Sequence, residues 1–230
     1  DVLREKAYQG CKEIFGSAVN VKLFRTAGHL LDTFVKEPAH IIGFGSYDWN
    51  YNLSLKVAQK VKKIRPESII VMGGANVDID PIENKNFLEQ NPSIDLLVFG
   101  EGEVAFSKIV QLWLDYHDTK DVIENIKSSP IADVRSLFKG ELIMGSGTDI
   151  IKELDSIPSP YLTGMFDEFL KSPQLMPIIQ KVRGCPNRCA FCVSGRQPSK
   201  LRSFSAERVI AEIDYLKEHS QNKIVRFADD

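Results

Sequence analysis

Short continuous apolar runs alternate with longer amphipathic stretches through the first half of the chain. We expect helices over residues 2–15 and around Leu30–Val35, with a strand over Val19–Phe24 between them. Three further apolar runs begin at residues 41, 69 and 96, 28 and 27 residues apart. Each is short and unbroken, as expected of a strand that helices cover on both faces.

This repeat predicts β-α-β units, which need parallel strands joined by helical crossovers. The expected fold class is therefore α/β, a doubly wound parallel sheet of Rossmann-like type. Ligands of such sheets bind at the carboxyl ends of the strands. The residues at those ends are Ser46, Gly73, Gly74 and Gly100.

The pattern becomes irregular between residues 128 and 175, where eight Gly and Pro residues fall, and then turns regular again. We expect a strand over Leu175–Val182, a loop over Cys185–Cys192, a helix over Ala206–Leu216 and a strand over Ile224–Phe227. This is a further β-α-β unit. The predicted organisation is a sheet domain over 1–125, a connector over 126–174 and a second domain over 175–230.

Composition and charge exclude some classes of protein but do not indicate a specific function. Of 230 residues, 43% are hydrophobic, and 29 basic against 31 acidic side chains leave a net charge of -2, so no global attraction to nucleic acid or acidic membranes is expected. No apolar run approaches the roughly 18 residues that span a bilayer. We expect a cytoplasmic protein with no membrane partner, and, because the chain starts at Asp1 and stops just after a strand-like run, a fragment of a longer protein.

Three of the four cysteines lie within eight positions, with the spacing CxxxCxxC: Cys185, Cys189 and Cys192. They could share one helix face as small buried residues, but Gly184 and Pro186 favour a loop in which thiolates converge. Structural zinc usually has four ligands, and no fourth Cys or nearby His accompanies this loop. On a four-iron cluster, three thiolates leave one iron open to a chelating ligand.

This motif, with an aromatic residue just before its last cysteine, resembles that of the radical SAM superfamily. The resemblance implies that Cys185, Cys189 and Cys192 hold a [4Fe-4S] cluster and that residues 175–230 begin a (β/α) partial barrel. It further implies that Phe191 packs near the adenine of S-adenosylmethionine. Asp229 and Asp230, after the second barrel strand, take the place that contacts the methionine end.

The strand ends and the Ile157–Tyr161 segment together resemble the cobalamin-binding radical SAM class. This implies that residues 1–125 are a B12-binding domain whose first strand is missing, with cobalamin near Ser46, Gly73, Gly74 and Gly100. The loop from Tyr47 to Asn50 could line the upper face of the corrin. His29 is not equivalent to the cobalt-ligating histidine of some members, so no axial ligand is assigned.

The resemblance implies an enzyme that cleaves S-adenosylmethionine to a 5'-deoxyadenosyl radical and transfers a methyl group from cobalamin to an unactivated centre. A small-molecule substrate and a one-electron reductant such as flavodoxin or ferredoxin are the expected partners, and these 230 residues are expected to be inactive alone. Two alternatives stay open: a cobalamin-free radical SAM enzyme catalysing a rearrangement or cyclisation, and a non-catalytic iron-sulfur or electron-transfer module. A tRNA methylthiotransferase is less favoured, because only Cys11 lies in the sheet domain.

A basic stretch surrounds the cysteines. Residues 181–208 hold seven Lys or Arg and one Glu, a net charge of +6, and include Arg196, Lys200 and Arg202. An anionic cluster and a cofactor carboxylate would account for part of this charge. A phosphorylated substrate or RNA could account for the rest, although a solvated surface is the commoner explanation.

Overall fold

A computed structural model describes residues 26–148, 150–187, 189–192 and 200–229. They form two compact units that divide between Ile150 and Ile151, and each is described by itself. We call residues 26–150 the sheet unit and the described residues from 151 onward the cysteine unit. The predicted helix over 2–15 and the strand over Val19–Phe24 lie outside the described residues.

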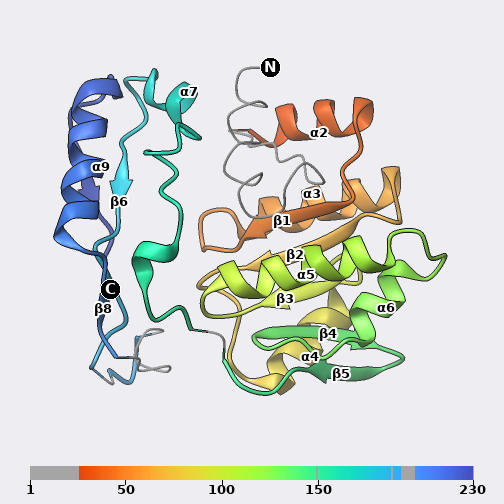
Figure 1. The fold of residues 1–230 in the computed structure, drawn as a ribbon. Coiled ribbons are helices and arrows are strands. Elements are labelled where there is room, and N and C mark those ends of the chain that lie inside the picture. The colour runs from red at the N-terminus through yellow and green to blue at the C-terminus, as the bar shows by residue number, and fades with distance from the viewer. Residues whose placement is uncertain (1–25, 149, 188, 193–199, 230) are drawn as a thin grey trace. The chain divides into compact units, whose positions relative to one another are not determined.

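The sheet unit contains a five-stranded sheet in the order β1-β2-β3-β4-β5 (Figure 1). Its strands are β1 (Ile41–Gly45), β2 (Ile69–Gly73), β3 (Leu96–Val98), β4 (Val134–Phe138) and β5 (Glu141–Met144). The first three are parallel, in a register that pairs Ile41 with Ile69 and Val71 with Leu96. The parallel, helix-covered strands predicted at 41, 69 and 96 are confirmed.

Helices cover both faces of this sheet, as expected of a doubly wound fold. They are α2 (Ala27–Lys36), α3 (Tyr51–Ile64), α4 (Pro81–Gln90), α5 (Gly102–Tyr116) and α6 (Val122–Ser128). Ile70 and Met72 pack with α2, α3 and α4 on one face, whereas Ile69 and Val71 pack with α5 and α6 on the other. Figure 1 shows α5 lying across the sheet. Because alternate side chains of β2 enter separate cores, its unbroken apolar run is explained.

The sheet unit extends further along the chain than the predicted boundary at residue 125. Strands β4 and β5, inside the predicted connector 126–174, form an antiparallel hairpin that pairs with β3. Lys139 and Gly140 join them with φ values of 51° and 82°, and two such residues are typical of a type I′ turn. The glycine that seemed to mark an irregular connector is therefore part of a regular turn.

The cysteine unit is built around a parallel β-α-β arrangement, which confirms the prediction for this part of the chain. Strand β6 (Ile178–Ile179) pairs with β9 (Arg226–Phe227), and α9 (Ala206–His219) connects them in sequence. The strand predicted over Leu175–Val182 is split, since β7 (Val182–Arg183) instead pairs antiparallel with β8 (Arg202–Ser203). The smaller elements η2 (Leu154–Ser156) and α7 (Asp167–Leu170) precede this arrangement.

Helix α9 begins at an N-cap residue, Ser205, and is buried at Glu212 and Leu216. The side chain of Ser205 accepts a hydrogen bond from the backbone N–H of Arg208, which caps the first turn. Leu216 is buried, whereas Ile210 is 57% exposed. Glu212 is also buried, and Arg208 Nε lies 2.8 Å from its carboxylate.

Among the described residues, no helix combines the length and apolar character needed to cross a membrane.

Candidate functional site

The carboxyl ends of β1 and β2 are joined by backbone contacts at the predicted ligand-binding edge. The N–H of Ser46 donates to the Gly73 carbonyl (2.5 Å), and the N–H of Asn76 donates to the Ser46 carbonyl (3.2 Å). Gly74 adopts φ 106°, and a Cβ atom there would lie 2.8 Å from the Ser46 carbonyl oxygen. Only glycine fits this close crossing of two loops. The structure thus brings together Ser46, Gly73 and Gly74.

Gly100 lies at the same edge, two residues after β3. Its φ of 69° turns the chain toward α5, and the preceding Phe99 N–H donates to the Asp133 carbonyl (3.1 Å). A Cβ atom on Gly73 would lie 3.2 Å from the Val98 carbonyl oxygen, so β2 and β3 also approach closely here. Glycines at this edge shape turns and close approaches of the backbone.

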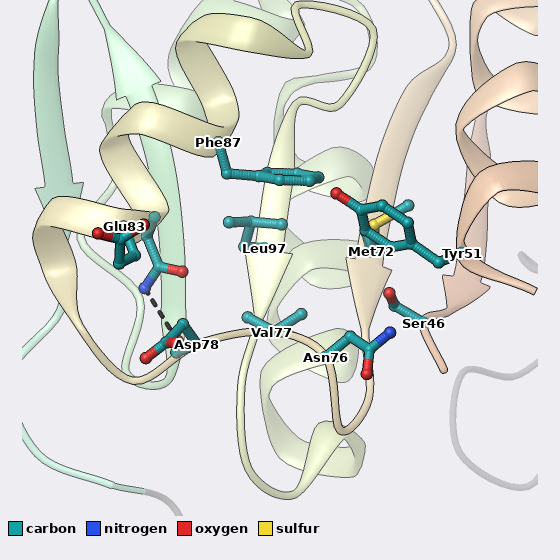
Figure 2. A pocket seen from close by; sticks show the side chains of 10 residues that line it. Ser46, Tyr51, Met72, Asn76, Val77, Asp78, Glu83, Phe87 and Leu97 are labelled. Atoms are coloured by element: carbon teal, nitrogen blue, oxygen red, sulfur yellow. Dashed lines mark hydrogen bonds between the residues drawn. The ribbon is translucent and has the colours of Figure 1, made fainter. Parts of the chain in front are cut away.

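A pocket of about 210 Å³ opens beside Ser46 (Figure 2). Its lining comes from the loop after β1, α3, β2, the loop after β2, α4 and β3, and consists of Ser46, Tyr51, Met72, Asn76, Val77, Asp78, Glu83, Asn84, Phe87 and Leu97. Ser46 is 1% exposed, and its hydroxyl has no hydrogen-bond partner within the described structure. A buried hydroxyl without a partner is unfavourable, and a bound group that accepts or donates a hydrogen bond would remove that cost.

Local sequence signals position the pocket walls. Asp80 caps α4 by accepting from the Ile82 N–H (2.7 Å), and Pro81 occupies the first helical position. The buried Asn84 then donates from Nδ2 to the Asp78 carbonyl (3.1 Å), which ties α4 to the loop after β2. The rings of Tyr51 and Phe87 lie 6.3 Å apart. The pocket combines aromatic and aliphatic walls with a few polar groups, which suits a flat heterocycle.

Sequence reasoning identified Ser46 but missed the other lining residues. The signal that could have found them is position, because Asn76–Asp78 directly follow Gly74 in the loop after β2, and such loops form ligand sites in open α/β sheets. The residues from α3 and α4 carry no such local signal. Only the packing of both helices on one face brings them together.

The Tyr47–Asn50 loop is held by its own polar side chain. Asn50 Oδ1 accepts from the Tyr47 N–H (2.9 Å), and Asn50 Nδ2 donates to the Gly45 carbonyl (2.9 Å). The ring of Trp49, 81% exposed, stacks on Tyr47 with centroids 4.8 Å apart and planes 2° from parallel. The stacked rings present an apolar surface at the end of β1. Trp49 is therefore not buried in the core, as a Trp in a loop more often is.

The cysteine loop leaves β7 through Gly184, whose φ is 93°. Cys185 and Cys192 are half-buried, Cys189 is exposed, and all three thiols are free. The Cys192 N–H donates to the Cys189 carbonyl (3.1 Å), so the last two cysteines are in a tight turn. Within the described residues, no three Cys, His, Asp or Glu side chains are already gathered as a metal site. The three free thiols suit iron-sulfur ligation by their chemistry.

Three residues were predicted to contact S-adenosylmethionine, and the structure describes two of them, Phe191 and Asp229. Phe191 is 92% exposed. Asp229 Oδ1 accepts from the N–H groups of Lys181 (2.8 Å) and Val182 (3.0 Å). Burial raises the pKa of Asp229, but these hydrogen bonds and Lys181 together bring it below the usual value. Asp230 lies outside the described residues.

Much of the basic stretch is already paired. Lys181 Nζ lies 3.4 Å from Asp229 Oδ2, Arg208 pairs with Glu212, and Arg202 Nη1 donates to the Ile151 carbonyl (2.6 Å). Lys200 is exposed, and Arg188 and Arg196 lie outside the described residues. Part of the positive charge of residues 181–208 is therefore explained by partners within the protein, and a bound nucleic acid is not needed to explain it.

Comparisons with known proteins agree with this architecture. The B12 binding domain family matches residues 12–110. The cobalamin-dependent radical SAM methyltransferase TokK of Streptomyces tokunonensis is 31% identical over 186 residues, 78% of this chain and 26% of that protein. The 2-(S-pantetheinyl)-carbapenam-3-carboxylate methyltransferase of Streptantibioticus cattleyicolor is 32% identical over the same shares. The chain therefore spans about a quarter of these curated relatives.

A solved structure extends the likeness to the whole chain. The cobalamin-dependent S-adenosylmethionine radical enzyme OxsB, with aqua-cobalamin and S-adenosylmethionine bound, matches with a TM-score of 0.71 at 18% identity. The match covers 98% of this chain and 31% of that one, and it shows a shared fold. Together these matches show that residues 12–110 match the B12 binding domain family and that the chain is similar to cobalamin-dependent radical SAM enzymes.

Proposed function

We propose that this chain is part of a cobalamin-dependent radical SAM methyltransferase that acts on a small molecule. The observation that carries the proposal is that one chain combines a B12-binding domain with the CxxxCxxC spacing of Cys185, Cys189 and Cys192. The proteins related to it at 31% and 32% identity are methyltransferases by name, and one of them is cobalamin-dependent and radical SAM by name.

The sheet unit fits cobalamin through its own residues. The partnerless Ser46 hydroxyl offers a hydrogen bond at the pocket wall, and the Gly73–Gly74 turn leaves backbone without side chains beside it. Tyr51, Phe87 and the aliphatic residues would hold a flat heterocyclic part of the ligand by dispersion contacts. The exposed Trp49–Tyr47 pair would pack against the corrin. When bound, cobalamin would carry the methyl group that is transferred.

The cysteine unit fits a [4Fe-4S] cluster. Cys185, Cys189 and Cys192 would be its thiolate ligands. When bound, the cluster would supply the electron for cleavage of S-adenosylmethionine to methionine and a 5'-deoxyadenosyl radical. The φ of 93° at Gly184 turns the chain directly before Cys185. Phe191, exposed beside Cys192, is free to pack on the adenine of a bound cosubstrate. A flavodoxin or ferredoxin would supply the electron.

Anaerobic turnover of the full-length protein tests this proposal. Purified, reconstituted with iron and sulfide, and reduced, it should form 5'-deoxyadenosine from S-adenosylmethionine. Cys189→Ala should abolish this product, whereas Cys11→Ala, outside the CxxxCxxC loop, should leave it intact. Full-length protein that assembles a cluster but forms no 5'-deoxyadenosine would overturn the enzyme proposal and favour an electron-transfer module.

A further inference from the structure

The carboxylate of Asp229 lies where the parallel ladder of the cysteine unit ends. The ladder's last backbone bond runs from the Ala228 N–H to the Ile179 carbonyl (2.9 Å). Directly beyond it, Asp229 Oδ1 accepts from two consecutive backbone N–H groups, those of Lys181 (2.8 Å) and Val182 (3.0 Å). A side chain 47 residues away in sequence thus satisfies the amides at the bend between β6 and β7.

This bend is the start of the strand that carries the cysteine loop. Val182 is the first residue of β7, and Cys185 follows it by three positions. β7 has only two residues and pairs only with the two-residue β8 in the described structure. Such a short ladder, extended by one bond from the Phe204 N–H to the Lys181 carbonyl (3.0 Å), fixes a strand weakly, so the two bonds to Asp229 add substantially to what holds it.

The two oxygens of this carboxylate are already engaged. Oδ1 has its two backbone donors, and Oδ2 lies 3.4 Å from the ammonium group of Lys181. A group with this many internal partners is poorly suited to bind the amino group of a cosubstrate, because that contact would compete with existing charge-assisted hydrogen bonds. The geometry favours a role within the protein.

We propose that Asp229 is a positioning residue that holds the base of the cysteine loop, and not a contact to S-adenosylmethionine. This inference rests on the proposed function, since it assumes that the three cysteines hold a cluster. Through Lys181 and Val182, the carboxylate fixes the direction in which the chain enters Gly184 and Cys185. Loss of the carboxylate should therefore disturb cluster assembly before it disturbs cosubstrate binding.

Three variants of the full-length protein test this role. Asp229→Asn keeps one oxygen that can accept both N–H groups but loses the charge and the oxygen that faces Lys181, whereas Asp229→Ala removes both acceptors. Asp80→Ala is the matched control, because Asp80 Oδ1 also accepts a backbone N–H, that of Ile82 (2.7 Å), in the sheet unit and away from β7. The readouts are amide hydrogen exchange over residues 178–187, iron bound per chain, and the electron paramagnetic resonance spectrum of the reduced cluster with and without S-adenosylmethionine.

We expect Asp229→Ala to raise amide exchange at residues 181 and 182 by about tenfold or more, as the loss of two hydrogen bonds implies. Its iron content should fall and its cluster spectrum should broaden. Asp229→Asn should restore protection and iron to within about twofold of wild type, and Asp80→Ala should match wild type in both. Rescue by Asn separates this role from a general loss of folding.

If the wild-type protein assembles a normal cluster, two results would overturn the inference about Asp229 without affecting the proposed function. One is unchanged exchange and iron content in Asp229→Ala. The other is a loss confined to the spectral response to S-adenosylmethionine, which would make Asp229 a cosubstrate contact. Wild-type protein that takes up no iron under reconstitution would instead refute the proposed function, and the inference about the loop would fall with it.

Discussion

The carbonyl oxygen of Ser46 occupies the space that a side chain on Gly74 would need, since a Cβ atom there would approach it to 2.8 Å. The loops that follow β1 and β2 therefore cross as backbone against backbone. The N–H of Ser46 donates to Gly73, next to Gly74, and holds this crossing together. The contact places the Ser46 hydroxyl at the wall of the pocket.

Gly74→Ala should break this crossing. The new methyl group would meet the Ser46 backbone, and the φ of 106° is itself strained for alanine, so we expect a loss of about 2 kcal/mol or more in the free energy of unfolding. Cobalamin retention should fall with it. Urea denaturation and the corrin content of purified protein measure the two effects. Gly28→Ala, where no atom lies within 4 Å, is the matched control and should be neutral or stabilising.

Ser46→Ala should separate stability from ligand binding. Because the Ser46 hydroxyl is buried without a partner, its removal should leave the cobalamin-free protein as stable or more stable by up to about 1 kcal/mol. Cobalamin affinity should fall by about five- to tenfold, as for the loss of one hydrogen bond. Denaturation of the cobalamin-free protein and equilibrium titration with hydroxocobalamin provide the measurements.

Ser68→Ala is the control for that experiment. Ser68 is equally buried, but its hydroxyl donates to the Ala39 carbonyl (2.7 Å) at the opposite edge of the sheet. Its replacement should cost about 1 kcal/mol of stability and leave cobalamin affinity unchanged. Ser46→Ala that behaves like Ser68→Ala would contradict a ligand role for the Ser46 hydroxyl.

Lys62→Met should destabilise the sheet unit by about 3 kcal/mol at neutral pH. Lys62 Nζ lies 2.7 Å from Asp95 Oδ2, the side chains being 16% and 5% exposed, and Asp95 also accepts from the Ile70 N–H. Without the lysine, Asp95 would be a buried charge with one backbone partner. Urea denaturation of wild type and variant at neutral pH measures the loss.

The same pair sets a pH dependence. Burial raises the pKa of Asp95 above its usual 3.8, although Lys62 acts in the opposite direction. The folded state then binds the proton more tightly than the unfolded state, so this group makes stability fall as pH rises from about 3.8 through the raised pKa. Lys62→Met should raise the pKa further, and its deficit against wild type should shrink on acidification. A deficit that stays constant with pH would contradict this account.

Tyr161→Phe should loosen the start of β6 in the cysteine unit. The Tyr161 hydroxyl donates to the Ile178 carbonyl (2.6 Å) and accepts from the Ile178 N–H (3.0 Å), and the residue is 6% exposed. Both backbone groups would lose their partner, at a cost of about 2 kcal/mol. Faster amide exchange at Ile178 is the direct readout. Tyr215→Phe, which removes only a bond to the Asp167 carboxylate, should leave Ile178 unchanged.

The parallel core of the fold follows from local sequence. The runs at 41, 69 and 96 are too short and too uniformly apolar for anything but strands covered on both faces, and their spacing leaves room for one helix each. The β4–β5 hairpin could not be predicted from local sequence, because its turn places Lys139 at positive φ, a conformation that lysine does not favour. The short strands β7 and β8 depend on a pairing across the cysteine loop that no periodicity encodes.

The candidate site could be predicted only in part, for a similar reason. Ser46 and the glycines at 73, 74 and 100 could be predicted because they follow apolar runs, and the three cysteines because of their CxxxCxxC spacing. The pocket residues of α3 and α4 become neighbours only through packing on one face of the sheet. The proposed positioning role of Asp229 rests on a contact across 47 residues, which its sequence position after β9 does not reveal.

The most direct test of the central claim is the corrin content of the full-length protein. Purified anaerobically with hydroxocobalamin and freed of unbound ligand, it should retain about one corrin per chain by its visible absorption, and Gly74→Ala should retain much less. Folded full-length protein that retains no corrin would contradict the cobalamin-dependent account and leave the sheet unit without its proposed ligand.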